Sequence, residues 1–119
     1  MAFAWDESLY YNPEKHGLQT VTEADAGGGY DFDKFMVWRD KKDLYYWGDD
    51  SGCSCPSPFE NIGSLSELGS GTAAEALGAL NRWKTEEAWN KDERVKASTG
   101  ATDTLRDLVR RQTSSVGKS

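Results

Sequence analysis

Two cysteines one residue apart, Cys53 and Cys55, carry the most distinctive chemistry in this sequence. Thiolates this close together can bind one metal ion, with His16 or an acid such as Asp49 completing a tetrahedral set. Structural zinc normally takes a second Cys or His pair, however, and His16 is the single histidine. We therefore favour packing of two small thiols in a tight Gly/Pro turn. Metal binding by Cys53, Cys55 and His16 is the alternative interpretation.

A redox role for the cysteines is a third interpretation. Reactive thiols need an environment that favours the thiolate, and the neighbouring Asp49, Asp50 and Glu60 would disfavour it. A disulfide between residues two apart would also close a small, strained ring. We expect a structural turn that contains Gly52, Cys53, Cys55, Pro56, Pro58 and Phe59.

Acidic side chains offer a second route to chemistry, through paired carboxylates. The candidates are Asp31, Asp33, Asp40, Asp43, Asp49 and Asp50. Asp31 and Asp33 flank Phe32 on the expected solvent face of a strand, and the other acids fall in or near turns, so a solvated role is favoured. One histidine, no cofactor fingerprint and no nucleophile pair leave little from which to build an active site. We expect a protein that is not an enzyme and uses no cofactor.

Charge and length narrow the class of protein further. The chain has 119 residues, the size of one domain, and a net charge of −6. An acidic body argues against nucleic-acid binding, which needs a basic face. The sequence has no apolar run of about 18 residues to span a membrane, and its start lacks the pattern of a signal peptide. The expected location is the cytoplasm.

The first half of the chain holds most of the aromatic residues and predicts a small sheet. Residues 17–23 favour a first strand, and residues 30–39 and 44–48 favour an antiparallel hairpin. If Lys41 and Lys42 form its tip, the facing pairs are Trp38 with Tyr45, Val37 with Tyr46 and Met36 with Trp47. Lys-Lys is a poor sequence for the positive φ of a two-residue turn, which leaves this register open.

Large apolar groups occur on both faces of the expected hairpin. One helix can cover only one face, so the other must be covered by the N-terminal arm, by the C-terminal helix or by a partner protein. The residues predicted to form a partner-binding face are Phe35, Val37, Tyr46 and Trp47.

The second half of the chain predicts helices. Thr72-Ala-Ala-Glu75 fits a capping box and opens an amphipathic helix that we expect to run to about Asn90. Residues 86–96 can extend it as a solvated helix, and residues 102–112 form a further amphipathic helix with Arg106, Arg110 and Arg111 near its end. Residues 113–119 have the composition of a frayed polar tail.

Together these patterns predict an α+β fold. We expect a small antiparallel sheet of three or four strands, packed by the helix from Thr72 through Leu77, Leu80 and Trp83, with a C-terminal helix and a short polar tail. The expected organisation is an α+β domain over residues 1–97, with an N-terminal arm and the cysteine turn, followed by the C-terminal helix and tail over residues 98–119.

The cysteine turn also carries a family resemblance. Gly-Cys-Ser-Cys-Pro at residues 52–56, the hairpin before it and Leu9-Tyr10-Tyr11-Asn12-Pro13 make residues 9–83 similar to small uncharacterised proteins of actinobacterial phages and their hosts. That resemblance implies a phage protein and assigns no reaction. We expect a protein that acts by contact with a host or phage protein. The alternatives are a minor structural or decoration protein of the virion and a small metal-binding module.

Overall fold

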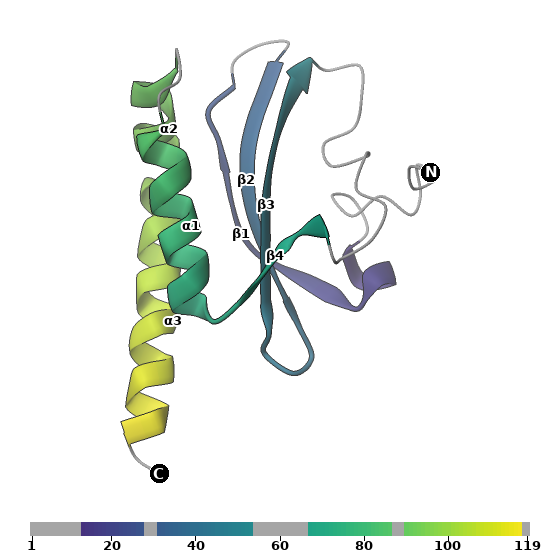
Figure 1. Cartoon of the computed structure of the whole chain (residues 1–119), viewed down its shortest axis with the longest axis vertical. Helices are drawn as coiled ribbons and strands as arrows, with labels where there is room; N and C mark the ends of the chain where they lie inside the picture. The colour runs from purple at the N-terminus through teal and green to yellow at the C-terminus, as the bar shows by residue number, and fades with distance from the viewer. Residues whose placement is uncertain (1–12, 28–30, 54–66, 87–89, 118–119) are drawn as a thin grey trace.

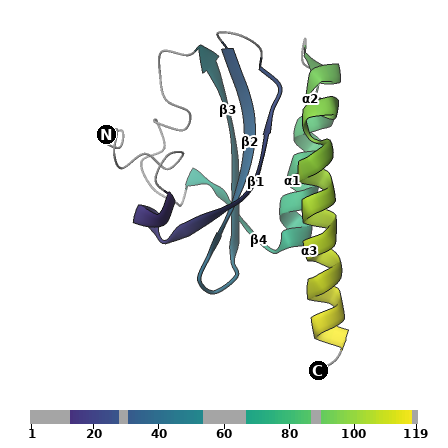
Figure 2. The same ribbon diagram turned by 180° about the vertical axis from the view of Figure 1, so that it is seen from behind.

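The computed structural model describes residues 13–27, 31–53, 67–86 and 90–117, and it has two layers. One layer is a four-stranded antiparallel sheet in which the strands follow chain order. They are β1 (Leu18–Asp25), β2 (Asp31–Asp40), β3 (Tyr45–Cys53) and β4 (Gly69–Gly71), and the short 3₁₀ helix η2 (Pro13–His16) precedes β1. All three α-helices lie on one side of this sheet (Figures 1 and 2). The α+β fold expected from the sequence is confirmed.

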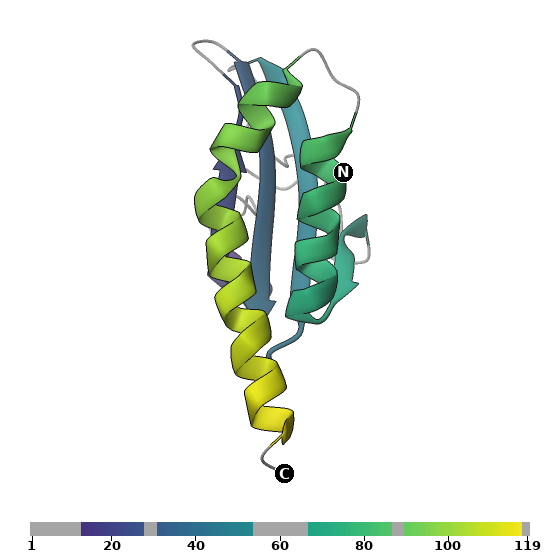
Figure 3. The same ribbon diagram turned by 90° about the vertical axis from the view of Figure 1, so that its left-hand side faces the viewer.

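The helical layer consists of α1 (Ala73–Thr85), α2 (Lys91–Ala97) and α3 (Thr99–Gly117). In Figure 3, α1 and α3 lie side by side across the sheet, with α2 at one end. The predicted capping box is present, because Thr72 accepts a hydrogen bond from the Glu75 N–H while the Glu75 carboxylate accepts one from Thr72 N–H. The prediction that this helix reaches Asn90 is wrong. Glu86 is extended, and the chain turns into a separate helix, α2.

The register of the hairpin differs by one residue from the simplest expectation. Trp38 faces Tyr46 and Val37 faces Trp47. The connection is longer than two residues: Asp43 has a φ of 65° and its N–H donates to the Asp40 carbonyl, while Asp40 N–H donates to the Leu44 carbonyl. This is a three-residue loop whose last residue is left-handed, and Asp tolerates that conformation better than Lys.

The two faces of β2 have different neighbours. Phe35 and Val37 are buried beneath the helices, in a cluster with Leu80, Trp83 and Leu105. Met36 and Trp38 point to the opposite face and are buried as well. The second face of the hairpin is therefore not left bare in this structure.

Helix α3 shares this core and runs further than predicted. Ala101 and Leu105 are 3% and 0% exposed and belong to the same cluster as the α1 side chains. The expected polar tail is helical up to Gly117. Burial of Leu105 ties the end of the chain to the sheet, contributing roughly 1.5–3 kcal/mol. None of the helices in the described ranges combines the length and apolar character needed to cross a bilayer.

Two predicted features lie outside the described residues. They are the N-terminal arm and the part of the cysteine turn after Cys53.

Candidate functional site

A buried ion pair joins the sheet to the corner between α1 and α2. Arg94 on α2 donates to both carboxylate oxygens of Asp33 on β2, with Nε 2.8 Å from Oδ2 and Nη2 3.1 Å from Oδ1. Asn90 Nδ2 donates to the same Oδ2 at 2.7 Å. The Arg94 and Asp33 side chains are 11% and 9% exposed. Two-point pairing of this kind fixes geometry as well as charge.

The same guanidinium also closes the end of α1. Arg94 Nη1 donates to the Trp83 carbonyl at 2.9 Å and to Glu86 Oε1 at 2.8 Å. Its central carbon lies 4.7 Å from the centre of the Trp83 ring, within the range of a cation–π contact. Arg94 therefore donates to a carbonyl in the last turn of α1 and stabilises this end of the helix.

Asp49 adds a third carboxylate to this corner. The residue is exposed overall, yet partial burial of its carboxyl and the nearby Glu86 carboxylate raise the pKa of Asp49 above its ordinary value of 3.8. Arg94 opposes this shift, and Asp33 and Asp50 add to it. Burial of the carboxyl is the larger cause, and the surrounding negative charge adds to it. The corner is a charged structural junction. Protonation of Asp49 at low pH removes its repulsion of the neighbouring carboxylates.

The prediction that Asp33 is solvated is therefore wrong. Asp33 shares the helix-covered face of β2 with Phe35 and Val37, because residues two apart in a strand point the same way. Its ion pair with Arg94 compensates for burial of the charge. Its partner is 61 residues away in the sequence, so no local spacing could reveal the pair. An arginine followed by an apolar valine in an otherwise charged segment gave no signal of a buried contact.

A second ionic cluster lies on the opposite face of the sheet. Lys34 Nζ is 2.6 Å from Glu23 Oε2 and 2.9 Å from Asp25 Oδ2, and the Lys34 side chain is 11% exposed. Burial acts to raise the pKa of Asp25, but hydrogen bonds from Lys34 and from the Gly27 and Asp33 N–H groups lower it below 3.8. This cluster ties β1 to β2 and has a structural purpose.

The four residues predicted to bind a partner do not share one exposed face. Phe35 and Val37 are 3% and 0% exposed and pack under the helices. Trp47, opposite Val37, packs against the same core, whereas Tyr46 lies opposite Trp38 on the other face. The grouping failed because neighbouring residues of a strand point to opposite faces, so Tyr46 and Trp47 cannot share one face in any register. The helices also cover the face that holds Phe35 and Val37. Phe35 and Val37 therefore cannot supply exposed anchors in this fold.

The cysteine turn is only partly described. Gly52 and Cys53 form the end of β3, opposite Phe32 and Asp31. The rest of the turn, with Cys55, Pro56, Pro58 and Phe59, lies outside the described residues. His16 ends η2. Within the described ranges, no group of three or more His, Cys, Asp or Glu side chains is arranged to hold a metal ion.

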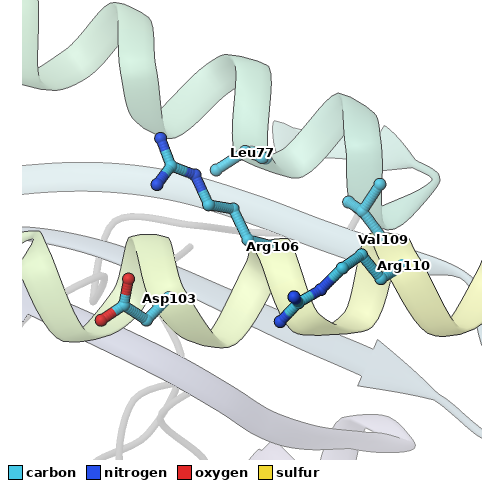
Figure 4. Close-up of a pocket in the computed structure, with 5 residues that line it drawn as sticks. All are labelled: Leu77, Asp103, Arg106, Val109 and Arg110. Carbon is cyan, nitrogen blue, oxygen red and sulfur yellow. The ribbon is translucent and has the colours of Figure 1, made fainter.

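An open groove runs between α1 and α3 on the surface of the helical layer. Its volume is 510 Å³, and its lining residues are Leu77, Asp103, Arg106, Val109 and Arg110. Leu77 and Val109 are half-buried and pack against the core from the two helices. In Figure 4 these two side chains point into the space between the helices, and Arg106 extends from α3 towards α1. The groove combines an apolar base with two exposed cations.

Sequence reasoning found the cations of this groove but not the groove. Arg106 and Arg110 were expected to decorate an ordinary amphipathic helix, and Leu77 was expected to pack on the sheet. The groove exists because α1 and α3 pack beside each other, and neither helix shows it alone. The spacing of Arg106, Val109 and Arg110 at three and four residues was the available signal that they share one helix face.

Comparison with known proteins identifies the family. No curated protein and no solved structure matched the chain. The model of a family described as a domain of unknown function (DUF7574) matches residues 7–115, which include every strand and helix described above except the last two residues of α3. The chain therefore belongs to the DUF7574 family.

Proposed function

We propose that this chain is a non-enzymatic protein-contact module and that its contact surface is the groove between α1 and α3. The observation that carries the proposal is the pair Leu77 and Val109, two apolar side chains that remain partly open between the helices. Apolar surface in a concave site is the usual anchor for a protein partner. The groove takes the place of the predicted hairpin face, because Phe35 and Val37 of that face are buried in the core.

The hydrogen bonding of the buried polar residues supports a protein-contact function rather than an enzymatic one. Both oxygens of Asp33 are hydrogen-bonded, and Arg94 is committed to Asp33, Glu86 and a backbone carbonyl. A general acid or base needs a group that can exchange protons with a substrate in a cleft. The buried corner uses its charges to hold α2 in place.

The setting we propose is a bacteriophage and the cytoplasm of its actinobacterial host, with a host protein as the partner. The support is the resemblance carried by Gly-Cys-Ser-Cys-Pro at residues 52–56. Mass spectrometry of purified phage particles tests the location. Many copies per particle would favour a part of the virion, and absence from particles would favour a role inside the host.

An affinity pull-down from host lysate tests the surface. Val109→Glu places a charge in the groove, and Val95→Glu makes the same change on α2, where Val95 is 46% exposed and outside the groove. We expect one host protein to be retained by wild type and Val95→Glu and lost with Val109→Glu. Thermal melting first checks that each variant is folded. If Val109→Glu unfolds, Arg106→Glu replaces it. Equal recovery with all three proteins would exclude the groove as the contact surface.

A further inference from the structure

The groove has an excess of positive charge on one side. Asp107 is shared by two arginines, with Arg110 at 3.5 Å and Arg111 at 3.0 Å. Arg106 has no ion pair or hydrogen bond within the described part of the chain, although it lines the groove. The side chain of Arg110 is 78% exposed, so its pair with Asp107 is weak. Both groove arginines are available to a partner.

The spacing of these arginines defines a geometry. Arg106 and Arg110 are four residues apart on α3, so their side chains leave the helix on one face, about 6 Å apart along its axis. Val109 lines the same groove from α3, and Leu77 lines it from α1 (Figure 4). A complementary surface has an apolar strip with two carboxylates beside it, one helical turn apart.

Resting on the proposed function, we infer that the groove binds an acidic amphipathic helix of the partner protein. Its apolar side chains lie on Leu77 and Val109, and two of its carboxylates, at positions i and i+4, pair with Arg106 and Arg110. A helix laid in a groove between two helices is a common mode of peptide recognition. Asp103, at the end of the groove, favours a basic residue one turn further along that helix.

The same observations favour a protein over a nucleic acid. Asp103 lines the groove and Asp107 adjoins it on α3. A helix can place neutral or basic residues beside these carboxylates, whereas a phosphate backbone has a negative charge at every nucleotide. The apolar base of the groove makes no favourable contact with a phosphate backbone, because proteins bind phosphates mainly through Lys and Arg.

Synthetic helices test the inference directly. The probe is a labelled amphipathic peptide of roughly 18 residues, long enough to form a helix, with leucines on one face and glutamates at i and i+4 beside them. A second peptide has lysine in place of each glutamate. Fluorescence anisotropy at low salt measures the affinity of the protein for each peptide. We expect the glutamate peptide to bind at least about fivefold more tightly, the factor expected from two exposed ion pairs.

Charge reversal in the protein provides the matched control. Arg106→Glu with Arg110→Glu should abolish the preference for the glutamate peptide and create one for the lysine peptide. Lys41→Glu with Lys42→Glu changes the net charge equally, at the exposed β2–β3 loop, and should leave the preference unchanged. Circular dichroism checks folding, and Arg106→Gln with Arg110→Gln replaces the reversed pair if it unfolds.

Three outcomes would overturn the inference. They are equal binding of both peptides, a preference that survives reversal of the groove charges, and tighter binding of a DNA duplex that is lost on that reversal. The pull-down separates this inference from the proposed function. A host protein that depends on Val109, together with equal binding of both peptides, would keep the groove as a contact surface and reject an acidic helix as its occupant.

Discussion

Arg94 on α2 holds Asp33 on β2 through two hydrogen bonds of 2.8 and 3.1 Å, and this pair attaches α2 to the sheet. Helix α2 has seven residues, none of them buried. A helix this short has little intrinsic stability and buries no apolar face of its own. Its position therefore depends on charge pairing with β2 and on the ends that join it to α1 and α3.

Arg94→Met should strongly destabilise the fold. The substitution leaves the Asp33 carboxylate buried with Asn90 as its remaining side-chain partner, and loss of one member of a buried pair costs about 3–5 kcal/mol. Urea denaturation at neutral pH measures the change. Arg110→Met, which removes an exposed pair with Asp107, should cost less than about 1 kcal/mol. Adding Asp33→Leu to Arg94→Met should recover part of the loss, because no unpaired charge then remains. Equal midpoints for Arg94→Met and Arg110→Met would contradict this account.

Asp49→Asn should stabilise the protein at neutral pH. Because the pKa of Asp49 is raised above 3.8 in the folded state, the folded chain binds a proton that the unfolded chain has already released. Stability from this residue is therefore lost as the pH rises from about 3.8 through the folded pKa. The variant removes that loss, and Asn keeps the size of the side chain.

The test of the Asp49 prediction is a pair of urea titrations, at pH 7 and at pH 3. The variant should unfold at a higher urea concentration than wild type at pH 7. The two midpoints should converge at pH 3, where Asp49 is protonated in both states. Asp25→Asn should act in the opposite direction at pH 7, because the pKa of Asp25 is lowered. A lower midpoint for Asp49→Asn at pH 7 would refute the prediction.

Gly69→Ala should destabilise the edge of the sheet. A Cβ at Gly69 would overlap the indole of Trp47, a rigid ring that packs against the core. Displacing a packed side chain of this size costs about 1–3 kcal/mol. Gly100→Ala is the matched control, since a Cβ there meets nothing within 4 Å, and alanine in a helix is neutral or stabilising by up to about 1 kcal/mol. Thermal melting compares the two, and similar melting temperatures would show that Trp47 can move aside.

Local sequence was enough to identify most elements. Aromatic and β-branched residues predicted the hairpin, and Thr72 with Glu75 predicted the start of α1, because strand preference and helix capping depend on neighbours a few residues apart. The expected strand at residues 44–48 is longer in the structure, where β3 extends to Cys53. Asp49 and Asp50 looked like a turn, but pairing with β2 holds them in the sheet.

What the sequence determined by itself is most of the elements and their order, because these follow from short-range preferences. Tertiary structure decided which face of the sheet the helices cover, where α1 ends and where a binding groove forms. Those outcomes depend on contacts between distant segments. Arg94 reaches Asp33 across 61 residues, and Leu77 and Val109 line one groove only because α1 and α3 pack side by side. The free energy of such contacts arises from burial and charge pairing in three dimensions, which no local spacing encodes.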